Sequence, residues 1–322
     1  MSKKKIYNVL IYGCGNIGYR HLQAILKLNL SVSICLYDIN IKKYAEYKKQ
    51  ILKDNLNLNS KSIYYLNDIK NYYFDLFICS SLAKNRYDQI RYVILNNSVR
   101  NILIEKIPFQ KVTEYKKINK LFKIKTIKAW VNCPNRTFNS YKNLKNILKN
   151  KDFNMKVSGS NWNLLSNSIH YIDLFNYLKK SNIIQINNNL NKPVNSKRKG
   201  FKEAHGGIDF IFSKKNYLKL ESYNNKNIPI KIEIFSKNIY LIIFEQHNQM
   251  YFQNMNNKII YSLKDFQIEY QSNLTNKIYY NILINQKCSL IEFSESINYL
   301  EPFLKNLKKY FKKFNYNNIP IT

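Results

Sequence analysis

Three glycines, Gly13, Gly15 and Gly18, stand in G-x-G-x-x-G spacing after a short apolar run, in a chain with only 7 glycines among 322 residues. At this spacing the first glycine permits a tight turn, the second lets backbone N–H groups approach a pyrophosphate, and the third lets a helix pack closely on a strand. Asp38 stands 20 residues after Gly18, where a carboxylate accepts hydrogen bonds from a ribose diol. The predicted cofactor-binding residues here are Gly13, Gly15, Asn16, Ile17, Gly18 and Asp38.

The predicted cofactor is NAD, because the charge of Asp38 would repel the 2′-phosphate of NADP. Lys42 and Lys43 follow closely and could reach such a phosphate, so NADP stays open as the alternative. A further alternative is a tight strand-to-helix turn that binds nothing.

The first 130 residues alternate between short apolar runs and longer amphipathic ones, as repeated βα units do. Continuous apolar strands indicate a parallel sheet covered on both faces. The predicted strands are Val9–Tyr12, Ser31–Tyr37, Ser62–Leu66, Phe74–Cys79, Asn101–Glu105 and Ile127–Val131, and the predicted helices are Ile17–Leu28, Ile41–Leu52, Arg86–Asn96 and Val112–Lys123.

After Pro134 the pattern changes to helices followed by a block of strands separated by polar turns, which is typical of antiparallel hairpins. We expect two domains: an α/β dinucleotide-binding (Rossmann) domain with a doubly wound parallel sheet over 1–130, and an α+β domain for substrate binding and oligomerisation, with a predominantly antiparallel open-faced sheet, over 131–322. The later predicted elements are helices Thr137–Leu148, Ser166–Leu178, Lys277–Asn285 and Ile291–Phe311, strands Met155–Ser160, Ile208–Phe212, Tyr217–Ser222, Ile230–Phe235, Ile239–Phe244 and Lys258–Ser262, and a loop at Asn187–Asn191.

The formal net charge of +32 could indicate a nucleic-acid or anionic membrane partner. The lysines are spread along the chain, however, and Lys, Asn, Ile and Tyr all have A/T-rich codons, so codon bias is the interpretation we favour over nucleic-acid or membrane binding. No apolar run approaches the ~20 residues of a membrane span. The five cysteines form no C-x-x-C pair, so neither a disulfide framework nor a metal site is predicted. We expect a cytoplasmic protein.

Several segments resemble the glucose–fructose oxidoreductase / inositol dehydrogenase (Gfo/Idh/MocA-type) family. Gly13-Cys14-Gly15-Asn16-Ile17-Gly18-Tyr19-Arg20-His21 resembles the family's opening, and Ile104-Glu105-Lys106-Ile107-Pro108 resembles its Glu-Lys-Pro motif with one extra residue. Asn132, Arg136 and Tyr141 resemble the segment after the last strand of the nucleotide domain. Ile169-His170-Tyr171-Ile172-Asp173-Leu174 resembles the family's histidine helix.

This resemblance implies an oxidoreductase that moves a hydride between a nicotinamide and a carbinol or carbonyl carbon of a sugar or nucleotide-sugar, with a role in surface-glycan synthesis as its weakest extension. It also points to a homodimer or homotetramer. Lys106 is the first catalytic candidate, because an ammonium at a strand end can polarise the substrate oxygen; the alternative is one more lysine among many. His170 is the second, as a general acid or base; the alternative is a core histidine.

One departure from the family concerns the helical turn before His170, where the family often has an aspartate and this chain has Ser166. A serine cannot hold a charge beside the imidazole, and Asp173 is a candidate substitute. The departure leaves open a second function, a non-catalytic dinucleotide-binding sensor or partner protein.

Weaker candidates complete the predicted site. Arg86 could contact the cofactor or a substrate, and Trp162 could either stack on a sugar ring or pack in the core. The further cofactor-binding candidates are Ser80, Ser81, Asn85, Glu105 and Lys106, and the substrate-binding candidates are Lys106, Asn132, Arg136, Trp162, Asn167, His170 and Asp173.

Overall fold

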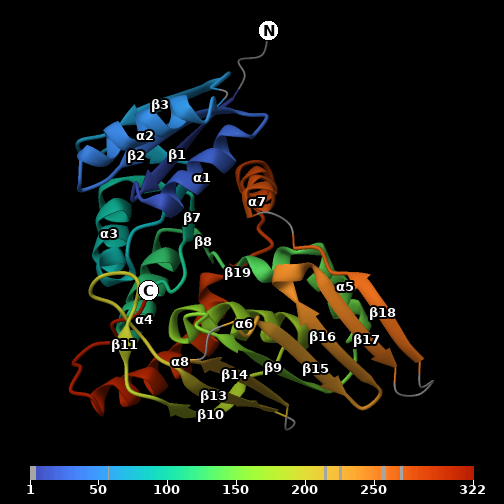
Figure 1. The fold of residues 1–322 in the computed structure, drawn as a ribbon. Helices are drawn as coiled ribbons and strands as arrows, with labels where there is room; N and C mark the ends of the chain where they lie inside the picture. The colour runs from blue at the N-terminus through green and yellow to red at the C-terminus, as the bar shows by residue number, and fades with distance from the viewer. Residues whose placement is uncertain (1–4, 57, 214–215, 225–226, 255–258, 269–270) are drawn as a thin grey trace. The chain divides into compact units, whose positions relative to one another are not determined.

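The computed structural model describes residues 5–56, 58–213, 216–224, 227–254, 259–268 and 271–322 (Figure 1). The chain divides into two compact units, and it crosses between them more than once. Unit 1 comprises Met1–Phe109, Thr113–Asn132 and Tyr270–Glu295, and unit 2 comprises Gln110–Val112, Cys133–Glu269 and Ser296–Thr322.

Unit 1 is built on a seven-stranded sheet in the order β19-β8-β7-β5-β1-β2-β3. All neighbouring pairs are parallel except β19, which runs antiparallel to β8. Every residue of β5 and β7 is buried, as expected of a parallel sheet with both faces covered. The strands are β1 (Ile6–Tyr12), β2 (Ser31–Tyr37), β3 (Lys61–Tyr65), β5 (Leu76–Cys79), β7 (Asn101–Ile104), β8 (Lys128–Val131) and β19 (Ile291–Glu292); β4 (Tyr73–Phe74) pairs separately with β6 (Ser98–Val99).

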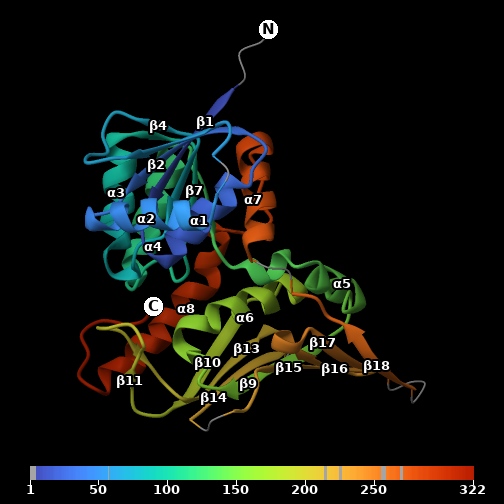
Figure 2. The ribbon, with the colours of Figure 1, turned by 45° about the horizontal axis from the view of Figure 1, so that its top comes forward.

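The helices of unit 1 cover both faces of this sheet (Figure 2). Right-handed crossovers place α1 (Asn16–Leu26) and α2 (Lys42–Lys53) on one face, and α3 (Ala83–Asn96) and α4 (Val112–Ile124) on the other, because the strand order reverses direction at β1. The helix α7 (Gln271–Asn285) joins α1 and α2 in one hydrophobic cluster with β1 and β2.

Unit 2 is built on an eight-stranded sheet in the order β10-β13-β14-β9-β15-β16-β17-β18. Among these described strands, β14 and β9 pair in parallel and the other neighbours pair antiparallel. The strands are β9 (Phe153–Ser160), β10 (Ile183–Leu190), β13 (Gly206–Phe212), β14 (Tyr217–Tyr223), β15 (Lys231–Ser236), β16 (Ile239–Phe244), β17 (Gln249–Asn254) and β18 (Ile259–Asp265), and β11 (Val194–Asn195) pairs separately with β12 (Lys202–Glu203).

Two helices pack on the same face of this sheet. Phe212 of β13 stacks on Phe175 of α6 (Leu164–Lys179) with ring centroids 4.3 Å apart, and Phe210 lies 5.8 Å from Phe303 of α8 (Phe293–Lys312). Among the residues that the structure describes, unit 2 also contains the helical elements η1 (Pro134–Thr137), α5 (Asn139–Ile147) and η3 (Glu245–His247).

The predicted fold class is confirmed: a parallel doubly wound sheet accompanies a second, mostly antiparallel sheet. The loop predicted at Asn187–Asn191 is wrong, because the edge strand β10 runs through the segment as far as Leu190, with Asn187 and Asn189 among its exposed positions. The predicted helix Ile291–Phe311 begins later, since β19 occupies its first two residues, and the strand β17 was not predicted. Lys258, at the start of another predicted strand, lies outside the described residues.

The observed division departs from a single boundary at residue 130, because the chain crosses between the units more than once and Gln110–Val112 belongs to unit 2. The segment Tyr270–Glu295 belongs to unit 1, because α7 buries its apolar face against α1 rather than continuing unit 2. Nothing local in the sequence of α7 signals which sheet it covers, since that is decided by tertiary packing.

Candidate functional site

The glycine turn joins β1 to α1, and two of its glycines are fixed by close contacts. Gly13 has φ +102°, a conformation that side chains rarely adopt, and a Cβ there would lie 2.8 Å from the backbone nitrogen of Ser81. A Cβ on Gly18 would lie 2.0 Å from the carbonyl oxygen of Gly13. The predicted roles of these two residues, a tight turn and close helix packing, match this geometry.

Gly15 differs from its neighbours, because a Cβ at this position would meet no atom within 4 Å. Gly15 is also the N-cap residue of α1, where no side chain forms a capping hydrogen bond, and the first helical turn contains no acidic residue. Among the described residues, no side chain therefore covers the N-terminus of α1 at Gly15, and backbone groups form its surface. Such a site suits an anionic group, because free N–H groups and the helix dipole both favour negative charge. The residues present fit a pyrophosphate.

Asp38 follows β2 directly and lies beside the turn. Its Oδ2 accepts a 2.6 Å hydrogen bond from the backbone N–H of Cys14, and its Oδ1 accepts one of 2.8 Å from that of Asn40. A carboxylate has about four lone-pair sites, so each oxygen keeps capacity for a ribose hydroxyl. The structure thus brings Asp38 and the glycines together and shows a second role that spacing alone did not reveal, which is to hold the turn.

The segment after β5 supports the turn from the other side. Ser80 Oγ donates to the carbonyl oxygens of Gly13 (2.8 Å) and Tyr12 (3.1 Å). Ser81 Oγ hydrogen-bonds to Gln89, and Asn85 is exposed at the start of α3. Ser80 therefore stabilises the backbone of the glycine turn. Ser80, Ser81 and Asn85 all follow β5, the strand next to β1, so they lie at the same end of the sheet as the turn.

Arg86 is 2% exposed, and its guanidinium donates to backbone carbonyls. These carbonyls belong to the segments after β5 and β7: Ser81, Glu105, Ile107 and Pro108. The guanidinium ties the two segments together. This arrangement favours a structural role over the cofactor contact that the sequence suggested.

A buried hydrogen-bond network surrounds Glu105, at the end of β7. Oε1 of Glu105 accepts from Nε2 of His21 (2.9 Å) and from Nδ2 of Asn132 (2.5 Å), and Nδ1 of His21 hydrogen-bonds to the hydroxyl of Tyr279. His21 is 2% exposed and Tyr279 is fully buried. Sequence reasoning placed Glu105 and Asn132 in different roles and missed His21 and Tyr279, although His21 stands three residues after Gly18.

Glu105 is ionised in this environment. Burial alone would raise its pKa, but hydrogen bonds and charge from His21, the Asn132 amide and the nearby Arg86 charge outweigh burial and lower the pKa from 4.5 to about 2. Lys106 follows directly and is partly exposed. The turn, Asp38, Ser80 and the Glu105–Lys106 pair therefore share the carboxyl edge of the parallel sheet, where α/β proteins bind ligands.

In unit 2, the structure brings two predicted substrate-binding residues into contact with each other. Asp173 is completely buried and accepts two 2.8 Å hydrogen bonds from Nε and Nη2 of Arg136 and one of 2.9 Å from the hydroxyl of Tyr299. The Arg136 guanidinium also lies 5.3 Å from the ring of Tyr177. Asp173 thus forms a buried ion pair with Arg136, and its role beside His170 stays a prediction.

A different carboxylate lies at that helical turn. Glu203 of β12 is 7% exposed and accepts from the backbone N–H groups of Leu165 (2.8 Å) and Ser166 (3.2 Å) and from the Ser166 hydroxyl. Glu203 therefore caps α6 from outside the helix. His170, one turn further along α6, is partly exposed. No local sequence pattern points to Glu203, because it lies 37 residues from Ser166.

Trp162 and Asn167 are joined near the start of α6. Nδ2 of Asn167 donates to the carbonyl of Trp162 (2.7 Å), and the indole N–H donates to the carbonyl of Glu221 (2.7 Å). Trp162 is 5% exposed and packs edge-on against Tyr171. This arrangement favours the core-packing interpretation of Trp162.

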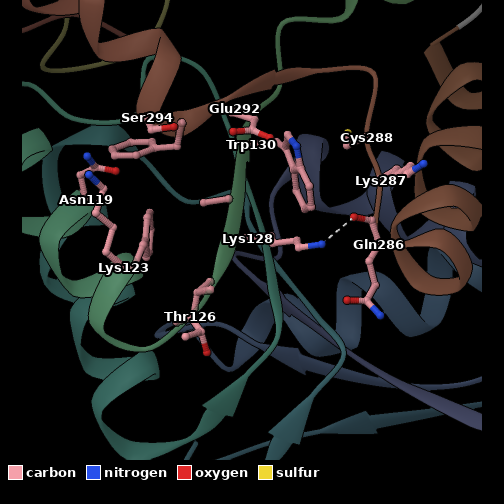
Figure 3. Close-up of a pocket in the computed structure, with 14 residues that line it drawn as sticks. Asn119, Lys123, Thr126, Lys128, Trp130, Gln286, Lys287, Cys288, Glu292 and Ser294 are labelled. Carbon is pink, nitrogen blue, oxygen red and sulfur yellow. Dashed lines mark hydrogen bonds between the residues drawn. The ribbon is translucent and has the colours of Figure 1, made fainter.

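A cavity of about 520 Å³ lies in unit 1 beside β8 (Figure 3). Thr126 and Lys128 place it toward the amino end of that strand, away from the carboxyl edge, and Lys128 Nζ donates to the Gln286 carbonyl (3.2 Å). Three of its 14 lining residues are lysines, whereas 52 of 322 residues in the whole chain are Lys or Arg. The lining is therefore hardly more basic than the chain, and the cavity gives no sign of an anion site.

Two searches of the described residues bear on other functions. They contain no group of three or more His, Cys, Asp or Glu side chains placed to hold a metal ion. No helix among them is long and apolar enough to cross a membrane.

We expect Gly18→Ala to lower the free energy of unfolding by about 3 kcal/mol, because its Cβ would overlap the Gly13 carbonyl and force α1 away from β1. Gly15→Ala is the control without a steric overlap and should cost about 1 kcal/mol or less, because alanine is a poorer N-cap residue than glycine. Urea denaturation followed by circular dichroism measures both. Equal losses in the two variants would contradict the assignment of Gly18 to packing.

The lowered pKa of Glu105 predicts a pH-dependent contribution to stability. Since the folded-state value of about 2 lies below the ordinary 4.5, the contribution is complete above pH 4.5 and is lost as the pH falls toward 2. Glu105→Gln should therefore cost up to about 3 kcal/mol at pH 7 and progressively less between pH 4.5 and 2. Denaturant titrations across this pH range test it, with the exposed Asp88→Asn as control. A pH-independent cost would show that the charge is not responsible.

Comparisons with protein-family models and with curated proteins find no match to this sequence. Solved structures do share its fold. UDP-N-acetylglucosamine 3-dehydrogenase GnnA from Acidithiobacillus ferrooxidans is 11% identical and aligns over 94% of this chain and 96% of its own, with a TM-score of 0.71. The transcriptional regulator Gal80p from Kluyveromyces lactis is 14% identical, over 98% and 94%, with a TM-score of 0.73. The dehydrogenase MviM from Clostridium difficile is 14% identical, over 95% and 99%, with a TM-score of 0.66.

The predicted resemblance is thereby confirmed at the level of the fold. The chain has the two-domain Rossmann-type fold that occurs both in Gfo/Idh/MocA-type oxidoreductases and in the regulator Gal80p.

Proposed function

We propose that this chain binds a nicotinamide dinucleotide and is an oxidoreductase that acts on a sugar or nucleotide-sugar. The observation that carries the proposal is the open backbone surface at Gly15, where the N-terminus of α1 meets the end of β1. A pyrophosphate is the ligand that such a surface accommodates best. Asp38, beside it on the next strand, supports a nucleoside whose ribose carries a free diol.

The proposed cofactor is NAD rather than NADP. Asp38 brings a negative charge to the position that a 2′-phosphate would need. Of the two lysines that could have offset this charge, Lys43 is paired with Glu46 at 2.5 Å. This pairing supports the diol form, although it is an exposed contact of modest strength.

The proposed chemistry is hydride transfer, which the nicotinamide supplies when bound. For Lys106 we propose that the ammonium polarises the substrate oxygen, and for His170 that the imidazole accepts a proton in oxidation or returns it in reduction. Glu203 and Ser166 hold the first turn of the helix that presents His170. The name of the structural neighbour GnnA supports a nucleotide-sugar as the substrate class, and a role in glycan synthesis would follow from it.

A second candidate is a non-catalytic dinucleotide-binding protein. Ser166 stands where the family often has an aspartate, and Asp173 is committed to Arg136 and Tyr299. The regulator Gal80p matches the fold as well as the dehydrogenases do. Either candidate requires the dinucleotide site, so nucleotide binding must be tested first and turnover second.

The first prediction concerns binding. Isothermal titration should show saturable binding of NADH, with NADPH at least about tenfold weaker. Asp38→Ser should remove most of this discrimination, whereas Asp88→Asn, an exposed carboxylate on α3, should preserve it. Absence of binding of either nucleotide to folded protein would refute both candidates.

The second prediction concerns turnover of UDP-N-acetylglucosamine and a panel of sugars and nucleotide-sugars. We expect reduction of NAD⁺ or oxidation of NADH with at least one member. Lys106→Met and His170→Ala should each lower kcat by about a hundredfold or more while the Kd for NADH stays within about threefold. Lys84→Met, an exposed lysine of α3, is the control. Tight nucleotide binding with no turnover would instead favour the non-catalytic candidate.

We also propose self-association through the face of the eight-stranded sheet opposite α6 and α8. That face carries an ordered set of charge pairs, including Lys156–Glu221 (2.8 Å) and Lys231–Glu233 (3.2 Å). Light scattering should give the mass of a dimer or tetramer, and Phe235→Lys, at a partly exposed ring of this face, should shift the protein toward monomer. A monomer at all concentrations would rule the interface out.

A further inference from the structure

The carboxylate of Glu105 is held in place by a buried hydrogen-bond network. Hydrogen bonds from His21 and Asn132 fix its Oε1, and Tyr279 in turn binds His21, so residues from α1, β7, α7 and the segment after β8 meet at one buried point. The side chain keeps 12% of its surface exposed. A fixed negative charge therefore reaches the carboxyl edge of the sheet.

The strand order gives the position of this charge relative to the proposed cofactor. The glycine turn follows β1, Asp38 follows β2 on one side of it, and Glu105 follows β7 beyond β5 on the other side. If the pyrophosphate lies at the turn and the adenosine ribose at Asp38, the second half of the dinucleotide extends toward the ends of β5 and β7. Glu105 and Asp38 thus serve opposite halves of the same ligand.

The two redox forms of nicotinamide differ in charge: the ring of NAD⁺ is a cation, and that of NADH is neutral. A nearby fixed carboxylate attracts the first and has little effect on the second. The cations close to Glu105 are Arg86, Lys106 and, when it is protonated, His21. Glu105→Gln leaves the charges of Arg86 and Lys106 in place, and a variant of Tyr279, which contacts His21, controls for the imidazole.

We propose that Glu105, held by His21 and Asn132, is a determinant of cofactor redox state and makes the chain bind NAD⁺ more tightly relative to NADH than an uncharged residue would. This inference rests on the proposed function. It goes beyond that function because it concerns the relative affinity for NAD⁺ and NADH. This ratio of affinities decides which redox form of the cofactor occupies the site.

The test compares Kd values for NAD⁺ and NADH, measured by isothermal titration at pH 7 on the full chain. In Glu105→Gln the amide oxygen can still accept from His21 and Asn132, so the charge is the main loss. We expect the Kd for NAD⁺ to rise about fivefold and that for NADH to change less than about twofold.

Two controls separate charge from structure. Asp75→Asn neutralises a 4% exposed carboxylate at the opposite, amino end of β5, where it accepts from the N–H of Asn8 at 2.9 Å. Tyr279→Phe disturbs the same network but leaves the charge of Glu105 in place. Both should keep the ratio of the two Kd values within about twofold of wild type.

The outcomes are distinct. A changed ratio in Glu105→Gln alone supports the inference. If Glu105→Gln weakens the binding of NAD⁺ and NADH equally, the inference is overturned. It is also overturned if Tyr279→Phe changes the ratio of the two Kd values as much as Glu105→Gln does. In both cases the proposed function is unaffected. A wild-type chain that binds neither nucleotide refutes the proposed function itself, and the inference falls with it.

Discussion

The contact between the backbone of α1 and the end of β1 is the constraint on which the candidate site depends. With hydrogen as the side chain of Gly18, the helix approaches the Gly13 carbonyl closely enough to exclude any Cβ. This approach aims the N-terminus of α1 at the space above Gly15. The hydrogen bonds from Ser80 and to Asp38 then fix the turn between the ends of β5 and β2. A displaced helix would lose the anion-binding geometry while the sheet beneath it stayed intact.

Acidic side chains are scarce in this chain, with 20 Asp and Glu against 52 Lys and Arg. Four of them, which are buried or partly buried, hold backbone or side-chain donors together. Asp38 binds the turn, Glu105 joins His21 to Asn132, Asp173 binds Arg136, and Glu203 caps α6. Each carboxylate accepts hydrogen bonds from protein donors in place of water, which keeps the free-energy cost of burying its charge small. The excess of lysine therefore remains mainly a property of the surface.

Sequence patterns were sufficient for the parallel strands of unit 1, because buried parallel strands are continuous apolar runs and the glycine spacing has a specific structural cause. They did not predict the antiparallel strand β19. Sequence patterns failed where contacts between distant segments determine the secondary structure or the partner of a side chain. The asparagines of Asn187–Asn191 are typical of a loop, but most of this segment belongs to the edge strand β10, whose pairing with β13 supplies its hydrogen bonds. The bond between Glu203 and Ser166 and the salt bridge between Arg136 and Asp173 were not predictable for the same reason. Residues that could bind a substrate could equally bind each other, and spacing does not distinguish the two.

The position of α7 has a consequence for how the chain folds during synthesis. Strands β1 to β8 are complete once residue 131 has been made, but Tyr279, Ile282 and Leu283 of α7 belong to the same hydrophobic cluster as β1 and β2. Until about 150 further residues have left the ribosome, α1 has α2 beside it but lacks α7, and His21 lacks the hydroxyl of Tyr279. The apolar surface of the N-terminal sheet and α1 that α7 covers therefore stays exposed to solvent while most of unit 2 is synthesised. Vectorial synthesis thus makes completion of the nucleotide-binding half one of the last events in the folding of this chain.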